Sequence, residues 1–235
     1  MLRLEKLSCG YGPMRAVTEL DLEIKEGEIH ALLGANGAGK SSTIMCIAGH
    51  VETHGGLMYY NDAEITKMPP PLRVRAGIGL VPEGRRLFSE LTVEENLIVG
   101  GYCRDKKETA PGIERVLTTF PRLKERINQQ AGSLSGGEQQ MLSMGRALMS
   151  QPRLLLIDEL SLGLMPKAID TCYSVINKLK MQGMTILLVE QNTTRVLDIA
   201  DQVIVLESGV KSWEGTGAEA DGNSALLEAY LGTAG

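Results

Sequence analysis

The chain has 235 residues and a formal net charge of −5 at pH 7, with a sequence pI of about 5.4. This length suits one large domain, and the acidic balance argues against a nucleic-acid-binding surface. Hydrophobic residues make up 43% of the chain, enough for a packed core, yet no uninterrupted apolar run approaches the roughly 20 residues of a membrane-spanning helix. The four cysteines form no C-x-x-C pair, so we expect reduced thiols of a cytosolic protein.

The N-terminal part of the chain is predicted to be mostly antiparallel β-structure. Apolar residues nearly alternate with charged ones over residues 2–7 and 20–24, which is typical of half-buried strands and not of a signal peptide. Residues 57–60 predict a further hairpin strand. The segment 25–28 is expected to close a hairpin into the apolar strand 28–33.

A glycine-rich loop follows this strand. Residues 34–41, GANGAGKS, match the phosphate-binding pattern G-x-x-x-x-G-K-[ST] at every fixed position, and the apolar run 42–48 can continue as a helix. Glycine lets backbone N–H groups surround phosphate oxygens, and the helix N-terminus adds about half a positive charge. Lys40 is predicted to bridge the β- and γ-phosphates of a nucleotide, and the Ser41 hydroxyl to ligate Mg²⁺. The predicted nucleotide-binding residues of this loop are Gly34, Ala35, Asn36, Gly37, Ala38, Gly39, Lys40, Ser41 and Ser42.

The middle of the chain changes from β-structure to helix. Consecutive prolines within 68–72 exclude regular helix there, and residues 78–82 form a short strand that ends at Glu83. Helical patterns then dominate, including a capping box at 92–95. We predict a single domain, 1–235, in which residues 1–84 and 151–235 form the core and the β-subdomain and residues from about 85 to 150 form an inserted helical subdomain.

The last third of the chain predicts alternating buried strands and helices. A helix over 166–182 begins at a proline and stops at a glycine. The expected strands are 154–158, 185–189 and 203–206, and a loop over 218–223 precedes a short last helix, 224–231. Continuous apolar strands that alternate with helices are typical of a parallel sheet covered on both faces.

An acidic pair ends the strand 154–158. Asp158 at the strand tip is predicted to hold Mg²⁺ through its water shell, and Glu159 to orient or deprotonate an attacking water. The phosphate loop alone is compatible with kinases, GTPases and many ATPases. The acidic pair narrows this set of protein classes.

A second anion site is predicted at 134–140, LSGGEQQ. Ser135 and Glu138 have capping-box spacing, and the two glycines between them leave the first-turn N–H groups of a helix bare. One nucleotide does not need two such sites in one chain. The second site is therefore expected to cover the nucleotide of another subunit.

Three segments, taken in chain order, resemble the Walker A, signature and Walker B motifs of ABC ATPase subunits: residues 34–41, 134–140 and 155–159. The resemblance covers essentially the whole chain. It implies an α/β fold, the P-loop ABC ATPase, with a mostly parallel core sheet, an N-terminal antiparallel β-subdomain and an inserted helical subdomain. It also implies a two-subunit sandwich in which each ATP lies between the phosphate loop of one subunit and the signature of the other. Tyr11, in a turn over 9–13, matches the aromatic residue that stacks on adenine. The signature residues expected to act on the partner's ATP are Leu134, Ser135, Gly136, Gly137 and Glu138.

Other segments resemble one branch of this family, the second ATP-binding subunit of importers for branched-chain amino acids and hydrophobic or amide relatives. The resemblance is carried by residues 81–86, 91–97, 161–164 and 189–192. In that branch Glu83 and Gln191 are usual where the wider family has Gln and His. Leu160, in place of Pro, departs even from the branch, and Leu164 stands where the family usually has an acidic residue.

The resemblance also implies roles at these positions. Glu83 is expected to meet Mg²⁺ or water, and Gln191 to donate a hydrogen bond to the γ-phosphate without carrying the charge of a histidine. We therefore expect an asymmetric pair whose site on this chain turns over slowly. The expected catalytic residues are Glu159, Lys40 and Gln191, and the expected Mg²⁺ ligands are Ser41, Asp158 and Glu83.

The implied function is to hydrolyse ATP for a membrane importer of branched-chain amino acids or related amides. The expected partners are transmembrane permease subunits, a sister ATP-binding subunit in a heterodimer, and indirectly a periplasmic or extracellular solute-binding protein, with no nucleic acid. The expected place is the cytoplasm, peripheral on the inner face of the cell membrane. The alternatives are the ATPase of an exporter or lipid transporter and a soluble, non-transport ABC ATPase.

Overall fold

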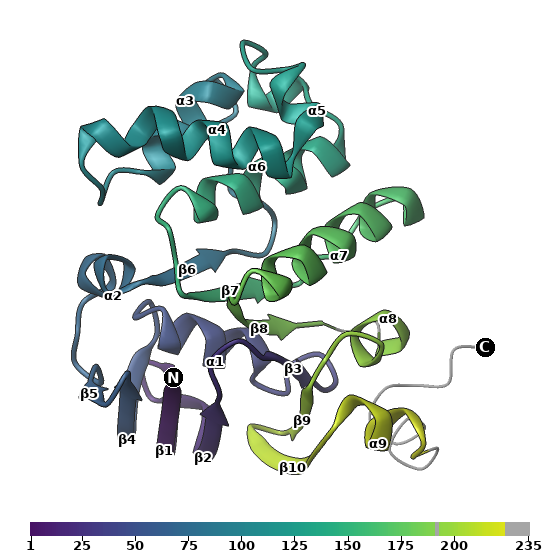
Figure 1. The fold of residues 1–235 in the computed structure, drawn as a ribbon. Coiled ribbons are helices and arrows are strands. Elements are labelled where there is room, and N and C mark those ends of the chain that lie inside the picture. Colours follow the sequence, from purple (N-terminus) through teal and green to yellow (C-terminus); the bar gives the residue numbers. More distant parts are fainter. Residues whose placement is uncertain (191–192, 224–235) are drawn as a thin grey trace.

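The structure is a computed structural model that describes residues 1–190 and 193–223, with helices packed on two β-sheets (Figure 1). Within these residues, the first sheet has strand order β2-β1-β4-β5 and the second has the order β10-β9-β3-β8-β7-β6. The strands of the first sheet are β1 (Leu2–Tyr11), β2 (Met14–Ile24), β4 (Glu52–Tyr60) and β5 (Ala63–Glu64). Those of the second sheet are β3 (Ile29–Leu33), β6 (Ile78–Val81), β7 (Leu154–Asp158), β8 (Thr185–Val189), β9 (Gln202–Glu207) and β10 (Val210–Gly215).

The second sheet is parallel except at one edge, where β10 pairs antiparallel with β9. The first sheet is antiparallel throughout. The predicted fold class, a mostly parallel core sheet with an N-terminal antiparallel sheet, is confirmed. In the part of the chain that the structure describes, no helix is long and apolar enough to cross a membrane.

The helices begin with α1 (Lys40–Ile47) behind the glycine loop. The others are α2 (Pro70–Ala76), α3 (Val93–Gly100), α4 (Thr109–Thr119), α5 (Pro121–Lys124), α6 (Gly136–Leu148), α7 (Pro166–Met181), α8 (Thr193–Leu197) and α9 (Gly217–Asp221), with single 3₁₀ turns at Lys106–Glu108 and Ala131–Ser133. In Figure 1 the helices α3 to α6 lie together at one end of the molecule, beyond the edge strand β6. We keep residues from about 85 to 150 as the proposed extent of a helical subdomain.

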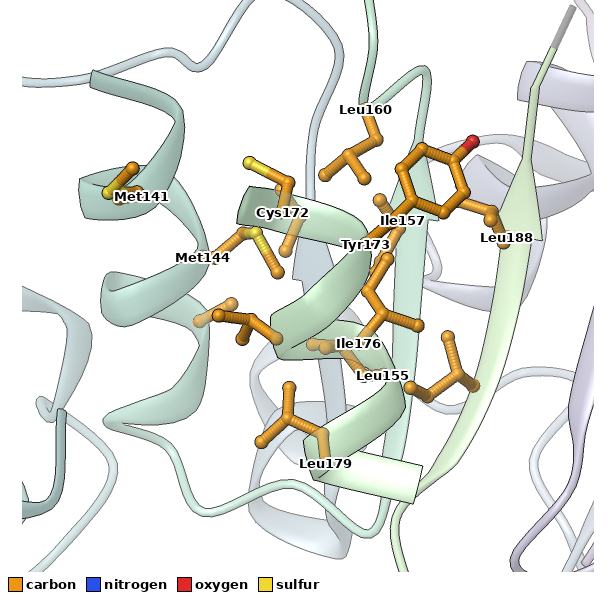
Figure 2. Close-up of a cluster of buried hydrophobic side chains, with 14 of the residues drawn as sticks. Met141, Met144, Leu155, Ile157, Leu160, Cys172, Tyr173, Ile176, Leu179 and Leu188 are labelled. Atoms are coloured by element: carbon orange, nitrogen blue, oxygen red, sulfur yellow. The ribbon is translucent and has the colours of Figure 1, made fainter. Parts of the chain in front are cut away.

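The core strands are buried on both faces, as their continuous apolar sequences predict. On β7, Leu154 and Leu156 pack with α1 and the antiparallel sheet, whereas Leu155 and Ile157 pack with α6 and α7. Figure 2 shows α7 between α6 and the sheet, with Ile176 directed into this second cluster. The packing of α1 against both sheets fixes this helix, and with it the glycine loop, between them.

The predicted hairpin at 25–28 is wrong. Strand β2 stays in the antiparallel sheet, whereas β3 lies in the other sheet between β8 and β9. Every residue of β3 is buried, so this strand needs a central position that a hairpin edge does not provide. Residues 25–28 instead carry the chain from one sheet to the other.

Three further boundaries differ from the prediction. The prolines within 68–72 do not exclude helix, because α2 begins at Pro70 with its prolines in the first turn, where no N–H is needed. The predicted turn 9–13 is shorter, since β1 continues to Tyr11. The predicted loop 218–223 contains α9, which a Thr216–Glu219 capping box begins. The expected helix 224–231 lies outside the described residues.

Candidate functional site

The glycine loop joins the end of β3 to the start of α1 and follows a path that only glycine fits at two points. Gly34 has φ 146° and Gly39 has φ 100°. A Cβ at Gly34 would lie 2.3 Å from the Leu206 carbonyl oxygen, and one at Gly39 would lie 2.6 Å from the Ala16 carbonyl oxygen. No side chain caps α1 and no acidic residue lies in its first turn. Its N–H groups therefore face the loop as an anion site.

Lys40 lies inside this loop. Its ammonium donates to the Gly34 carbonyl oxygen at 2.7 Å and to that of Ala35 at 3.0 Å, and its side chain is 4% exposed. Burial lowers the pKa of Lys40, and the nearby carboxylates Glu159, Asp158 and Glu190 oppose this by favouring the cation. A cation is thus fixed over the concave side of the loop.

Asp158 ends β7 directly beneath Ser41. The Ser41 hydroxyl donates to Asp158 Oδ1 at 2.8 Å, and Asp158 is 3% exposed. Burial raises the pKa of Asp158, and the charges of Glu83 and Glu159 raise it further, against the Ser41 hydrogen bond and Lys40. A hydroxyl and a carboxylate in contact are hard oxygen ligands that suit Mg²⁺. Within the described residues, no three His, Cys, Asp or Glu side chains form a metal site by themselves.

Glu159 has an unusual backbone conformation, with φ 51°, and its N–H donates to the Val189 carbonyl oxygen at 3.0 Å. The next residue, Leu160, is fully buried in the core and points toward Cys172 and Tyr173 (Figure 2). Where the family usually has a proline, this chain therefore fixes the segment after Glu159 by apolar packing.

Ser161 contacts Glu190, a pair that the sequence did not single out. The Ser161 N–H and hydroxyl donate to the two carboxylate oxygens of Glu190 at 2.9 and 2.8 Å, and we call this contact the Ser161–Glu190 clasp. Glu190 is 1% exposed. The available signal was an acidic residue directly after a buried apolar strand, the same pattern that pointed to Asp158. Gln191, the next residue, lies outside the described part of the chain.

An open cavity of about 840 Å³ brings most of the predicted residues together. Tyr11, which is 52% exposed at the end of β1, lies at this cavity with Glu83 and Glu159. The loop residues that line it are Asn36, Gly37, Gly39, Lys40, Ser41 and Ser42, and Asp158 reaches it through Ser41. Gly34, Ala35 and Ala38 shape the loop without lining the cavity.

Residues 134–138 do not line this cavity. Ser135 caps α6, with Glu138 N–H donating to its hydroxyl at 3.4 Å and Ser135 N–H donating to the Glu138 carboxylate at 3.0 Å. The Ser135 hydrogen bond lowers the pKa of Glu138, and Arg126 and Arg122 add to this effect. The α6 N-terminus therefore carries the predicted capping box, and its residues lie outside the cavity at the chain's own phosphate loop.

Comparison with known proteins decides the family. The family model described as ABC transporter matches residues 17–161. The chain is 47% identical to the high-affinity branched-chain amino acid transport ATP-binding protein BraG of Pseudomonas aeruginosa, over 99% of this chain and 100% of the relative. It belongs to the ABC transporter family. The predicted family, fold class and ATP hydrolase activity are confirmed.

Further ABC relatives agree with this assignment. The probable branched-chain amino acid transport ATP-binding protein LivF of Archaeoglobus fulgidus is 40% identical over 93% of both chains, and BraF of Pseudomonas aeruginosa is 30% identical over 100% of this chain and 98% of the relative. The solved structure of the ADP conformation of an ABC transporter cassette has a TM-score of 0.86 and 25% identity over 97% of both chains.

The buried carboxylate of this ABC subunit gives a stability prediction. Because the folded pKa of Asp158 is raised, its ionised form opposes folding, and stability falls as pH rises through that pKa. In Asp158→Asn the amide oxygen still accepts the Ser41 hydrogen bond, and the charge is gone. We expect the melting temperature of the nucleotide-free chain at pH 7 to rise by about 2–4 °C, the shift that 1 kcal/mol gives at this size.

Differential scanning calorimetry without nucleotide or Mg²⁺ measures this shift. Asp62→Asn is the matched control, because Asp62 is exposed and its φ of 63° suits asparagine. A melting temperature of Asp158→Asn below the wild-type value would contradict the electrostatic account of this site.

Proposed function

We propose that this chain is the ATP-hydrolysing subunit of an importer for branched-chain amino acids or related amides. The observation that carries the proposal is its 47% identity, over nearly the full length of both proteins, with BraG, whose name specifies high-affinity branched-chain amino acid transport. The ordered site around Lys40, Asp158 and Glu159 supports an ATPase role in such a machine.

In the proposed reaction the triphosphate lies on the N–H groups of the Walker A loop, and Lys40 leaves its carbonyl partners to meet the β- and γ-phosphates. Tyr11 stacks on the adenine. Ser41, Asp158 and Glu83 would hold Mg²⁺, which when bound would neutralise charge on the phosphates. Glu159 orients and deprotonates the attacking water, and the hydrogen bond from its N–H to the Val189 carbonyl oxygen fixes its position. Gln191 keeps its predicted role as a hydrogen-bond donor to the γ-phosphate.

We propose that the signature residues act on the ATP of a sister subunit. The support is geometric, because the α6 N-terminus offers N–H groups to an anion but lies outside the cavity of its own chain. Pseudomonas aeruginosa has both BraG and BraF, which are 47% and 30% identical to this chain. A BraF-like protein is therefore the proposed sister in a heterodimer.

The permease is proposed to dock on a groove of about 580 Å³ beside the edge strand β6. Phe88, Val99 and Tyr102 line this groove and are exposed apolar side chains. A transmembrane partner there would hold the chain peripherally on the cytoplasmic face of the membrane, with the solute-binding protein reached indirectly.

The asymmetric pair gives a prediction. If the site on this chain turns over slowly, then Glu159→Gln should leave at least about half of the ATPase rate of the heterodimer, whereas the matching change in the sister should lower it about 100-fold or more. Steady-state ATPase assays of the two complexes measure this difference. Equal loss in both complexes would show that the two sites work equally.

Affinity purification from gently solubilised native membranes tests the function itself. With this chain tagged, mass spectrometry should find two different permease subunits and a second ATP-binding subunit. Recovery of membrane proteins of an exporter or a lipid transporter would instead identify the chain as the ATPase of such a transporter. Ribosomal or DNA-repair partners, with nothing from the membrane fraction, would contradict a transport role.

A further inference from the structure

The loop after β6 runs from the nucleotide cavity to the signature helix. It starts at Glu83, which lines the cavity, and continues through Arg85 and Arg86. Both arginines have left-handed backbones, with φ 64° and φ 45°. Non-glycine residues keep this conformation only where their surroundings fix it, and strain of this kind gathers at functional segments.

Helix α6 fixes the backbone of Arg85. The Arg85 carbonyl oxygen accepts from the Ser143 hydroxyl at 3.0 Å and from Arg146 Nη2 at 3.2 Å, and both donors lie on α6. The carbonyl thus ties the Glu83 loop to the middle of the signature helix.

The Arg85 side chain makes a second connection, at the start of α6. Its Nη1 donates to Gln139 Oε1 at 3.2 Å, and Gln139 Nε2 donates to the carbonyl oxygen of Leu134 at 3.2 Å. Gln139 Nε2 also lies 3.4 Å from the Ala131 carbonyl oxygen. A continuous chain of hydrogen bonds therefore leads from the Glu83 loop to the first residue of the signature.

The guanidinium group also lies against two glycines. A Cβ at Gly136 would be 3.4 Å from Arg85 Nη2, and one at Gly163 would be 3.9 Å from it. Gly136 begins α6, and Gly163 belongs to the segment that follows Glu159. Because a cation beside a helix N-terminus is electrostatically unfavourable, helix stability gives no reason for an arginine here.

We propose that Arg85 is a positioning residue that couples the nucleotide site of this chain to its signature. When nucleotide engages Glu83, the loop moves, and Arg85 and Gln139 carry that movement to the backbone at Leu134, over the sister's ATP. This inference rests on the proposed heterodimer, and it adds the residue through which the two sites communicate.

The test compares Arg85→Gln with Arg86→Gln in the complex with the sister subunit. Arg86 is the matched control, because it is the exposed neighbour, and within residues 1–190 and 193–223 its side chain makes one long hydrogen bond, 3.4 Å from Nε to the Glu83 carbonyl oxygen. We expect Arg85→Gln to lower turnover about tenfold and to bring the Hill coefficient for ATP to about 1, within the usual range of coupling between sites. The affinity of the isolated chain for Mg-ATP and its melting temperature should stay at wild-type values, and Arg86→Gln should change none of these.

Gln139→Ala and Arg85→Gln together form a double-mutant cycle. Gln139→Ala should reproduce the loss of cooperativity, and the double variant with Arg85→Gln should be no worse than either single variant, because both break one connection. Arg85→Lys keeps the charge and one donor, so it should restore part of the cooperativity.

Three results would overturn the proposal. They are wild-type cooperativity in Arg85→Gln, additive losses in the double variant, or a fall in melting temperature and Mg-ATP affinity that accounts for the lost turnover. A wild-type pair without ATPase activity would overturn the proposed function and this inference together, which separates that outcome from a failure of Arg85 alone.

Discussion

Replacing Gly136 by aspartate is expected to lower ATP turnover by the complex with the sister subunit about 100- to 1,000-fold, the loss seen when one charge-stabilising donor of an active site is removed. In the proposed heterodimer, the first turn of α6 offers its N–H groups to the sister's γ-phosphate. A carboxylate at its first residue fills that position and repels the phosphate. The measurement is the steady-state ATPase rate of the complex at saturating Mg-ATP.

Gly136→Ala is the steric control for this change. The nearest atom to a Cβ at Gly136 is the Nη2 of Arg85, at 3.4 Å, which is the end of a flexible side chain. Alanine should therefore fit and keep most of the turnover. Gly137 is not suitable as a control, because its Cβ would lie 2.8 Å from that of Ala168. Near-wild-type turnover in Gly136→Asp would contradict the composite site.

Lys40→Ala is expected to weaken binding of Mg-ATP to the isolated chain about 100-fold or more, since two charge-assisted contacts to phosphate are lost at about 1.5–3 kcal/mol each. The nucleotide-free chain should fold normally, because burial already lowers the pKa of Lys40 and opposes its charge. Isothermal titration calorimetry measures the affinity, and a thermal melt without nucleotide measures the folding.

Lys25→Ala is the matched control, because Lys25 is exposed in the connection between β2 and β3. It removes the same charge from the chain as a whole and should bind Mg-ATP as the wild type does. An unchanged affinity in Lys40→Ala would show that the phosphates bind elsewhere.

The sequence predicts the elements of this fold better than their partners. The buried strands at 154–158 and 185–189 are recognisable because a strand covered on both faces must be apolar at every position. Which sheet a strand joins depends on contacts far along the chain, and the hairpin expected at 25–28 failed for that reason. The edge strand β10 was missed because polar residues such as the half-buried Lys211 and the exposed Glu214 hide its pattern.

The candidate site also combines a local feature that the sequence predicts with distant contacts that it does not. The phosphate loop was predictable because its motif is continuous in the sequence and its backbone has positive φ angles at Gly34 and Gly39, which glycine adopts readily. The Ser161–Glu190 clasp and the Arg85–Gln139 hydrogen bond join residues 29 and 54 positions apart. No local pattern reports such a contact. The departure at Leu160 became interpretable only with the core packing in view (Figure 2).

Transport by a reconstituted complex tests the central claim most directly. The complex purified through this chain would be placed in liposomes, with Mg-ATP on the side of the ATPase subunits and the solute-binding protein on the other side. Uptake of labelled leucine, isoleucine or valine would be followed over time. We predict uptake that requires ATP and is lost with Gly136→Asp. ATP hydrolysis at full rate without uptake of any branched-chain amino acid would contradict the proposed function.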